Sequence, residues 1–263
     1  MEYFETHAHY DDEKFNEDRE ETIKKIYESG VTKCVNVGCS IETSKKSVEF
    51  AKKYDFIYAI CGIHPSEIPQ TEEQLWKDIA EIENIVTSNK KIVAIGEIGL
   101  DYHYEGYNKE MQQKAFIEQI KLANKLGLPV SIHTRDAIDD TIAILLKNKI
   151  VNGGILHCCP FNKELVRHGI ELGFYIAFGG TCTFKNSKNA KEILNMVPDD
   201  KILIETDSPY LSPEPYRGTR NDSSNLKYVV EKIAEYKNDT PENVARYTYN
   251  NAMRIFERGL KND

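Results

Sequence analysis

The sequence predicts a single α/β domain over residues 1–263, folded as a (β/α)8 TIM-type barrel with an extra C-terminal helix. Three observations support this prediction. Short apolar runs rich in β-branched residues alternate with longer stretches of helical periodicity, which is typical of parallel strands joined by helices. Eight such units follow one another, and no linker-like segment divides them. A length of 263 residues is also typical of one barrel of this kind.

Each predicted strand is a short run, apolar enough to be buried on both faces. The runs lie at residues 3–7, 33–38, 57–62, 92–97, 129–133, 154–157, 174–177 and 202–206. Helical spacing of apolar residues follows at 17–29, 43–54, 73–88, 109–126, 136–147, 163–172, 188–196 and 223–236. A further helix is expected to begin at Thr240-Pro241, because a capping threonine followed by proline is typical of a helix start.

Hydropathy, cysteine spacing and charge exclude several classes of protein. No apolar run approaches the length of a membrane helix, and the N-terminus lacks the basic segment of a secretory signal. The six cysteines form no C-x-x-C pairs, so neither a zinc knuckle nor a disulfide framework is expected. A net charge of −8 argues against a surface that coats duplex nucleic acid, but it allows a site that grips one phosphate. We therefore expect a cytoplasmic protein with no membrane contact and no obligate protein partner.

Ionisable side chains gather where the predicted strands end. In chain order they are His7 and His9, His64, Glu97, His133, His157 and Asp207. The carboxyl ends of barrel strands form one mouth, and active sites of this fold lie there. These residues, far apart in the sequence, are therefore expected to meet in one place.

The spacing of these residues indicates a metal site. Residues two apart on a strand point the same way, so His7 and His9 could hold one ion together. The two carboxylate oxygens of Glu97 could bridge two ions. His133 and His157, from neighbouring strands, could hold the second ion.

Asp207 could ligate the first ion and also carry a proton, because the eighth strand lies beside the first in a closed barrel. A single histidine at a strand end is more often structural than a ligand. We interpret His103 and His168 as structural for that reason. For the whole set of strand-end residues, coincidence is a poor explanation.

Several longer motifs point to one family. They are ETHAH at residues 5–9, CGIHP at 61–65, AIGEIGLDY at 94–102, PVSIHTRDA at 129–137, IETDSPYL at 204–211, RN at 220–221 with SNL at 224–226, and PENVA at 241–245. Because of these motifs, which cover nearly the whole chain in order, the sequence resembles the TatD-type metal-dependent deoxyribonucleases of the amidohydrolase superfamily.

The resemblance implies a barrel that binds two divalent metal ions and hydrolyses phosphodiesters. By position in the motifs, His7, His9, Glu97 and Asp207 look like the ligands of one ion, and Glu97, His133 and His157 look like those of the other. Glu97 and Asp207 would therefore lie at the catalytic centre. His64 is similar to a histidine that faces the substrate phosphate.

The sequence departs from the family pattern in three places. Glu5 replaces the usual aspartate, residues 157–161 read HCCPF where HCFSG is usual, and Thr219 occupies a position where lysine is common. The metal ligands survive all three changes. The loops after the sixth and eighth strands are altered, which affects the expected grip on phosphate.

The proposed chemistry is attack by a metal-activated water on a phosphodiester, with Asp207 moving the proton. His64 and Arg135 are expected to contact the phosphate, and Arg220 and Asn221 the flanking nucleotide. The acidic net charge favours an exonuclease that takes the end of single-stranded DNA, with RNA left open. Magnesium, manganese and zinc all suit a mixed histidine and carboxylate site.

Two alternatives stay open at this point. One is another amidohydrolase chemistry, such as hydrolysis of an ester, lactone or amide. The other is a metal-binding scaffold without turnover, although a structural site has no need of Asp207 as a proton carrier. A panel of substrates tests the first, and metal-dependent turnover of an oligonucleotide tests the second.

Overall fold

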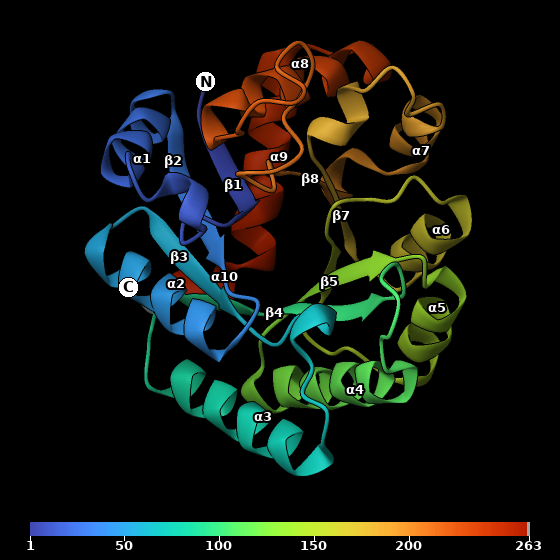
Figure 1. The fold of residues 1–263 in the computed structure, drawn as a ribbon. Helices are drawn as coiled ribbons and strands as arrows, with labels where there is room; N and C mark the ends of the chain where they lie inside the picture. The colour runs from blue at the N-terminus through green and yellow to red at the C-terminus, as the bar shows by residue number, and fades with distance from the viewer. Residues whose placement is uncertain (262–263) are drawn as a thin grey trace. The chain divides into compact units, whose positions relative to one another are not determined.

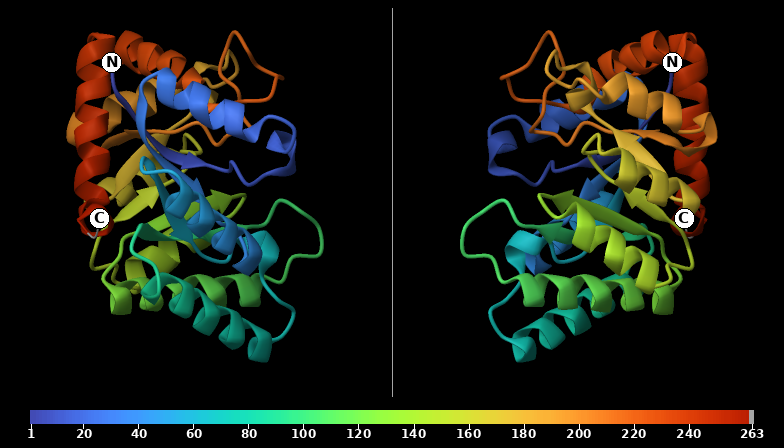
Figure 2. Two further views of the ribbon diagram at one scale, coloured as in Figure 1. Left: turned by 90° about the vertical axis from the view of Figure 1, so that its left-hand side faces the viewer. Right: turned by 90° about the vertical axis from the view of Figure 1, so that its right-hand side faces the viewer.

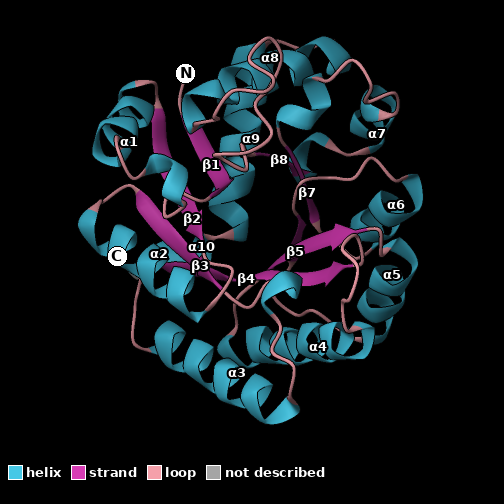
Figure 3. Cartoon of the chain, viewed as in Figure 1, coloured by secondary structure: helices cyan, strands magenta, loops and turns pink. Residues whose placement is uncertain are grey.

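The computed structural model describes residues 1–261, along which strands and helices alternate (Figures 1 and 3). The strands are β1 (Tyr3–Ala8), β2 (Val31–Val37), β3 (Ile57–Cys61), β4 (Ile92–Asp101), β5 (Val130–Arg135), β6 (Gly154–Leu156), β7 (Tyr175–Phe178) and β8 (Ile202–Ile204). The helices are α1 (Arg19–Glu28), α2 (Ile41–Lys53), α3 (Glu72–Thr87), α4 (Lys109–Leu126), α5 (Ile138–Lys147), α6 (Lys163–Glu171), α7 (Ala190–Met196), α8 (Leu226–Lys237), α9 (Pro241–Ile255) and α10 (Glu257–Leu260). Each predicted strand and helix is present, with ends that differ by a few residues.

The strands form one eight-stranded sheet whose order, β1 to β8, follows the chain. Neighbouring strands pair in parallel, as in β1 with β2, β4 with β5 and β7 with β8. Beyond the last strand, Ser208 forms a parallel bridge with Ala8 of β1. Parallel strands in chain order, each followed by a helix, confirm the predicted (β/α)8 fold class.

The chain divides into two compact units, and we describe each by itself. The first consists of Met1–Asn36 and His157–Arg254, and the second of Val37–Leu156 with the residues from Ile255 onward. The prediction of a single domain over residues 1–263 stays a prediction, and its last two residues lie outside the described part of the chain.

The first unit is built around strands that are buried along their length. All six residues of β1 are buried, and so are those of β7 and β8. On α8, the buried residues include Leu226, Val229, Val230 and Ile233, which lie on one face of the helix at spacings of three and four. Because β1 is buried along its length and lies against β8, the polar residues on it and just after it are held in place.

The second unit places α3 and α4 side by side, as both views of Figure 2 show. α4 lies against β4, whose ten residues are all buried. The helix ends at Gly127, which takes the left-handed conformation (φ 70°) that favours glycine as a helix C-cap. α2 begins with a capping box between Ser40 and Thr43.

Two predicted strand ends are wrong. β4 continues past Glu97 to Asp101, and β5 continues past His133 to Arg135. The reason lies at Gly99, where φ is 143° and a Cβ atom would lie 1.9 Å from the carbonyl oxygen of His133. Only a glycine lets the two backbones pass this closely, so the strands remain paired beyond the candidate ligands.

The extra C-terminal helix is confirmed as α9, which begins at Pro241. The hydroxyl of Thr240 accepts a hydrogen bond from the backbone N–H of Asn243 (3.2 Å), so it caps the helix as predicted. Within residues 1–261, the helices are all too short or too polar to cross a membrane.

Candidate active site

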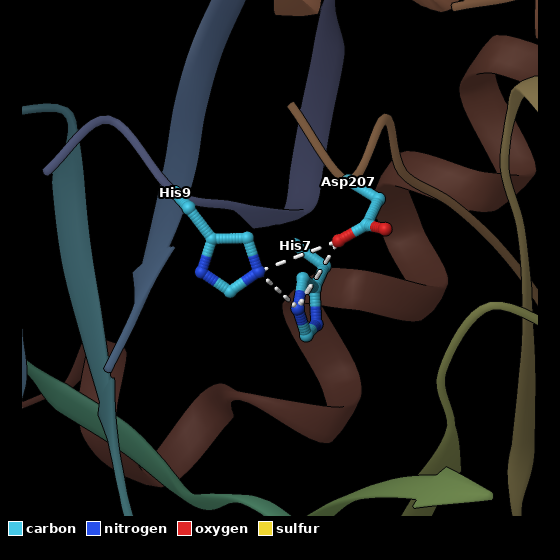
Figure 4. Close-up of side chains that lie close together, drawn as sticks. All are labelled: His7, His9 and Asp207. Carbon is cyan, nitrogen blue, oxygen red and sulfur yellow. Dashed lines mark hydrogen bonds and ion pairs between the residues drawn. The ribbon is translucent and has the colours of Figure 1, made fainter. Parts of the chain in front are cut away.

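Three histidine side chains of the first unit surround one carboxylate oxygen of Asp207. We call His7, His9, His157 and Asp207 the Asp207 cluster. The Nε2 atoms of His9, His7 and His157 lie 3.3, 3.8 and 3.9 Å from Asp207 Oδ1. Figure 4 shows how His7 and His9, on and just after β1, point toward Asp207 in the segment after β8. These four predicted site residues therefore lie close together within the unit, and their role as ligands stays a prediction.

Glu205 fixes the orientation of His157. Its buried carboxylate accepts hydrogen bonds from His157 Nδ1 (3.0 Å) and from the backbone N–H of Cys158 (2.7 Å). Because a carboxylate accepts at Nδ1, the neutral ring carries its proton there and turns a lone pair outward at Nε2. The His157 ring also stacks on His7 at a centroid distance of 3.4 Å. Glu205 was not among the predicted site residues, although it lies in the IETDSPYL motif.

Asp207 is held as a carboxylate by its neighbours. Burial alone would raise its pKa, but the hydrogen bond with His9 and the charges on His157, His9 and His7 keep the pKa below the usual value. Its backbone is also fixed, because its N–H donates to the carbonyl of His7 (2.9 Å). An ionised, positioned carboxylate can serve as a metal ligand or accept a proton.

Glu5 holds the residues beside the Asp207 cluster in place through hydrogen bonds. One of its oxygens accepts hydrogen bonds from the backbone N–H groups of His7 and Thr206 (3.0 Å each), and the other accepts from the Thr206 hydroxyl (2.6 Å). Glu5 is fully buried, and burial raises its pKa to about 7 even though these hydrogen bonds lower it. The glutamate that departs from the family pattern thus joins the strand before the histidines to the segment that carries Asp207.

The second unit holds another group of ligand-type side chains, which we call the Glu97 cluster: Glu97, His133, His64, Asp101 and Cys39. His133 contacts two carboxylates, with Nδ1 2.9 Å from Glu97 Oε1 and Nε2 3.1 Å from Asp101 Oδ2. The thiol of Cys39 lies 3.8 Å from Glu97 Oε2. Glu97 and Asp101 are both buried.

Asp101 was not among the predicted site residues. Burial tends to raise its pKa, but the hydrogen bonds from His133 and from the backbone of His103 outweigh this effect and lower it. The signal was present in the motif around Glu97, where Asp101 follows four residues later. Sequence alone did not show that β4 continues to Asp101 and brings both carboxylates to His133.

His64 lies in this cluster but differs chemically from His157. Its Nδ1 accepts the backbone N–H of Ser66 (3.1 Å), so the neutral ring carries its proton on Nε2. That N–H faces Glu97 Oε1 at 3.8 Å. His64 is therefore arranged to donate a hydrogen bond, which suits contact with an anion better than ligation of a metal.

Both clusters fit a divalent cation by the chemistry of their donors. Imidazole nitrogens and carboxylate oxygens suit zinc, manganese and magnesium. Sets of donors that lie within 4.8 Å of one another inside a single unit include His7, His9 and Asp207, and His7, His157 and Glu205, in the first unit, and His64, Asp101 and His133 in the second. The lone pairs of these nitrogen and oxygen atoms repel one another, and a bound cation would be coordinated by them instead.

The three remaining predicted substrate residues are engaged within their own units. Arg135, at the end of β5, donates to the hydroxyl of Tyr104 (3.4 Å). Arg220 pairs with both oxygens of Asp18 (2.7 and 2.5 Å). Asn221 is fully buried, and its amide donates to the carbonyls of Thr206 and Tyr210, so its side chain holds the segment after β8 in place. Their contacts with substrate stay predictions.

Comparison with known proteins gives a consistent result. The sequence matches the family described as TatD related DNase over residues 4–257. YabD of Bacillus subtilis (strain 168), described as an uncharacterized metal-dependent hydrolase, is 44% identical over 255 residues, which cover 96% of this chain and 98% of that protein. The 3′-5′ ssDNA/RNA exonuclease TatD of Salmonella typhimurium is 30% identical over 252 residues, which cover 93% of this chain and 95% of that protein.

A solved structure agrees with the sequence relatives. The crystal structure of YJJV, a TatD homolog from Escherichia coli K12, superposes with a TM-score of 0.91 at 25% identity, over 97% of this chain and 98% of that one. Because the family match and a 44% identical relative both span nearly the whole sequence, the protein belongs to the TatD related DNase family of metal-dependent hydrolases.

Proposed function

We propose that this protein is a two-metal phosphodiesterase that removes nucleotides from an end of single-stranded DNA, and of RNA. The proposed ligands are His7, His9, Glu97, His133, His157 and Asp207. The observation that most supports the proposal is the Asp207 cluster, in which three imidazole Nε2 atoms face one carboxylate oxygen. That Glu97 binds both ions is part of the proposal and rests on the family resemblance.

The protein's own groups would position and move protons. Bound divalent ions would supply positive charge for the phosphoryl oxygens and lower the pKa of a water. Asp207, kept ionised by its histidines, accepts the proton of the attacking water or delivers one to the leaving oxygen. The Nε2–H of His64 donates a hydrogen bond to a phosphate oxygen. Glu205 keeps His157 in its ligating orientation.

Two facts support a single-stranded nucleic acid as the substrate. The Salmonella relative is named a 3′-5′ ssDNA/RNA exonuclease. The net charge of −8 disfavours wrapping of a duplex, where binding energy comes largely from neutralised phosphates. Binding the end of a single strand, in contrast, requires only a local site.

The test is digestion of single-stranded DNA and RNA labelled at either end, in chelator and with added magnesium, manganese or zinc. We expect metal-dependent turnover, with 5′-labelled strands giving a ladder of shortened products and 3′-labelled strands releasing mononucleotide. Esters, lactones and amides are assayed in parallel. Turnover of one of those, with no strand digested, would show a different hydrolase chemistry.

Asp207→Asn should retain the fold but lose about 10²–10⁴-fold in strand cleavage at saturating metal, the usual contribution of a positioned general acid or base. Asn has nearly the same shape but carries neither the charge nor the proton. Asp55→Asn, at an exposed position between α2 and β3, is the control and should cleave like the wild type. Near wild-type cleavage by the Asp207 variant in excess manganese would exclude Asp207 as the proton carrier.

A further inference from the structure

Three tyrosines lie in the loop between β4 and α4, which continues directly from the Glu97 cluster. Tyr104 is 63% exposed and Tyr107 42% exposed, although large aromatic side chains are usually covered. In both views of Figure 2 the loop projects away from the ends of the strands. We propose that Tyr104 with Arg135 forms a binding site for a nucleotide of the single strand, in which the tyrosine ring stacks on the base. This inference rests on the proposed function, because it names how that substrate is held.

Hydrogen bonds and ring stacking stabilise the conformation of the loop. The Tyr102 hydroxyl donates to Asp140 Oδ2 (3.0 Å) and accepts from Gln113 (3.1 Å). The ring of Tyr102 stacks on Tyr107, with a centroid distance of 4.6 Å and an interplanar angle of 8°. One end of the loop is therefore anchored to α4 and α5, and little ordering is needed when a ligand binds.

The same end of the loop is also tied to the Glu97 cluster through His103, the residue after Tyr102. The backbone N–H of His103 donates to Asp101 Oδ1 (2.9 Å), and its ring Nδ1 contacts Asp136 Oδ2 at 2.7 Å. The residues on either side of Tyr104 and Arg135 are thus linked to each other. His103, interpreted from the sequence as structural, ties the two strand ends together.

Arg135 lies over the exposed ring. Its guanidinium carbon is 5.3 Å from the ring centroid of Tyr104, and one of its nitrogens donates to the Tyr104 hydroxyl (3.4 Å). Aromatic rings bind bases of any sequence by stacking, and a neighbouring arginine adds charge for the phosphate. The ring would stack on the base of a nucleotide, and the guanidinium beside it would pair with the phosphate.

The position of this pair relative to the cluster supports the assignment. Arg135 pairs with Asp101 in the register of β4 and β5, and it follows His133 by two residues on the same strand. Two residues of a strand span roughly 7 Å, and their side chains point to the same side. A nucleotide whose phosphate reaches His133 therefore has Tyr104 within reach of a base.

The acidic net charge favours such a site. With −8 overall, long-range attraction of a polyanion is weak, so affinity must come from short-range contacts. Stacking on an exposed ring is a short-range contact that does not depend on net charge. The exposed ring of Tyr104 contributes little to the stability of the fold, because most of its surface is in contact with water.

The test measures strand binding by fluorescence anisotropy. Two strands with the same number of phosphates are compared, a deoxythymidine decamer and an abasic decamer, with manganese present. All proteins carry Asp207→Asn so that the strands survive. Tyr104→Ala should weaken binding of the decamer with bases roughly 5- to 150-fold, the usual contribution of one stacked base, and change binding of the abasic strand little.

Two variants make the result interpretable. Tyr104→Phe keeps the ring and should bind like the parent, whereas Tyr27→Ala removes a similarly exposed ring (54%) from α1 and should also bind like the parent. Equal loss on both strands, or no loss on either, would overturn the stacking site. Absence of cleavage of any strand by the wild type would instead contradict the proposed function, and the binding assay still reports on Tyr104.

Discussion

His64 and His157 show how a hydrogen bond decides what a histidine can do. In the sequence the two look alike, because each is a histidine at or just after the end of a predicted strand. A backbone N–H at Nδ1 makes His64 a donor at Nε2, and a buried carboxylate at Nδ1 leaves a lone pair on Nε2 of His157. The position of these histidines could be predicted from the sequence. The roles expected for them came from strand-end position and the family resemblance, whereas the hydrogen bonds that distinguish the two rings could not be predicted, because Glu205 is 48 residues away from His157 in the chain.

Glu5 gives a prediction for the pH dependence of stability. Burial raises its pKa from 4.5 to about 7, so the fold favours the protonated form. The stabilisation is complete below the unfolded pKa and is lost as the pH rises through the folded one. Between about pH 4.5 and 7.5, the wild type should lose up to roughly 3 kcal/mol relative to Glu5→Gln, whose side chain is neutral throughout.

The measurement is urea unfolding of both proteins in chelator across that pH range. Glutamine can satisfy the same partners, because its oxygen accepts from the backbone N–H groups and its amide faces Thr206. Glu2→Gln, at an exposed position three residues earlier, is the control and should show no such trend. A difference between wild type and Glu5→Gln that stays constant with pH would refute the assignment.

At the scale of elements, β4 depends on one glycine. Gly99→Ala should destabilise the protein by about 2–4 kcal/mol, because the residue has a positive φ and its Cβ would collide with the His133 carbonyl. Gly106→Ala is the matched control. It also has a positive φ (83°), but no atom lies within 4 Å of its Cβ, so about 1 kcal/mol of backbone strain is expected.

Denaturant unfolding of the two variants under the same metal-free conditions separates steric collision from backbone strain. Equal losses would mean that the approach of β4 to β5 does not require Gly99. Because the collision involves His133, the Gly99 variant should also bind metal more weakly than the Gly106 variant. This second readout connects the strand to the Glu97 cluster.

Which elements form was predictable, because periodicity and length separate buried strands from amphipathic helices. Where β4 and β5 end was not. A glycine in a strand is usually a sign of weakening, and only the neighbouring backbone shows that Gly99 prolongs the pairing instead. The three tyrosines between Tyr102 and Asn108 are visible in the sequence, but their stacked arrangement depends on contacts with α4 and α5.

For the molecule as a whole, metal binding should raise the free energy of unfolding. A ligand present at 100 times its dissociation constant stabilises the folded state by about 2.7 kcal/mol. For a chain of this size, that corresponds to a rise in the unfolding midpoint of roughly 5–10 °C. Thermal unfolding with manganese and with chelator measures this shift.

His9→Ala should reduce the manganese-dependent shift, because it removes one donor from the Asp207 cluster while leaving the core of β1 intact. His168→Ala is the control, since His168 lies on α6 and contacts Glu171 outside both clusters. The same shift in wild type and His9→Ala would show that the ion binds elsewhere.

The Asp207 cluster joins residues 7 and 9 to residue 207, and this separation governs when the site can exist during protein synthesis. A ribosome adds about 5–20 residues per second, so the two histidines emerge roughly 10–40 s before the aspartate that completes their ligand set. A nascent chain therefore carries no assembled Asp207 cluster. Any activity that needs this cluster therefore begins only after Asp207 has been synthesised and has left the ribosome.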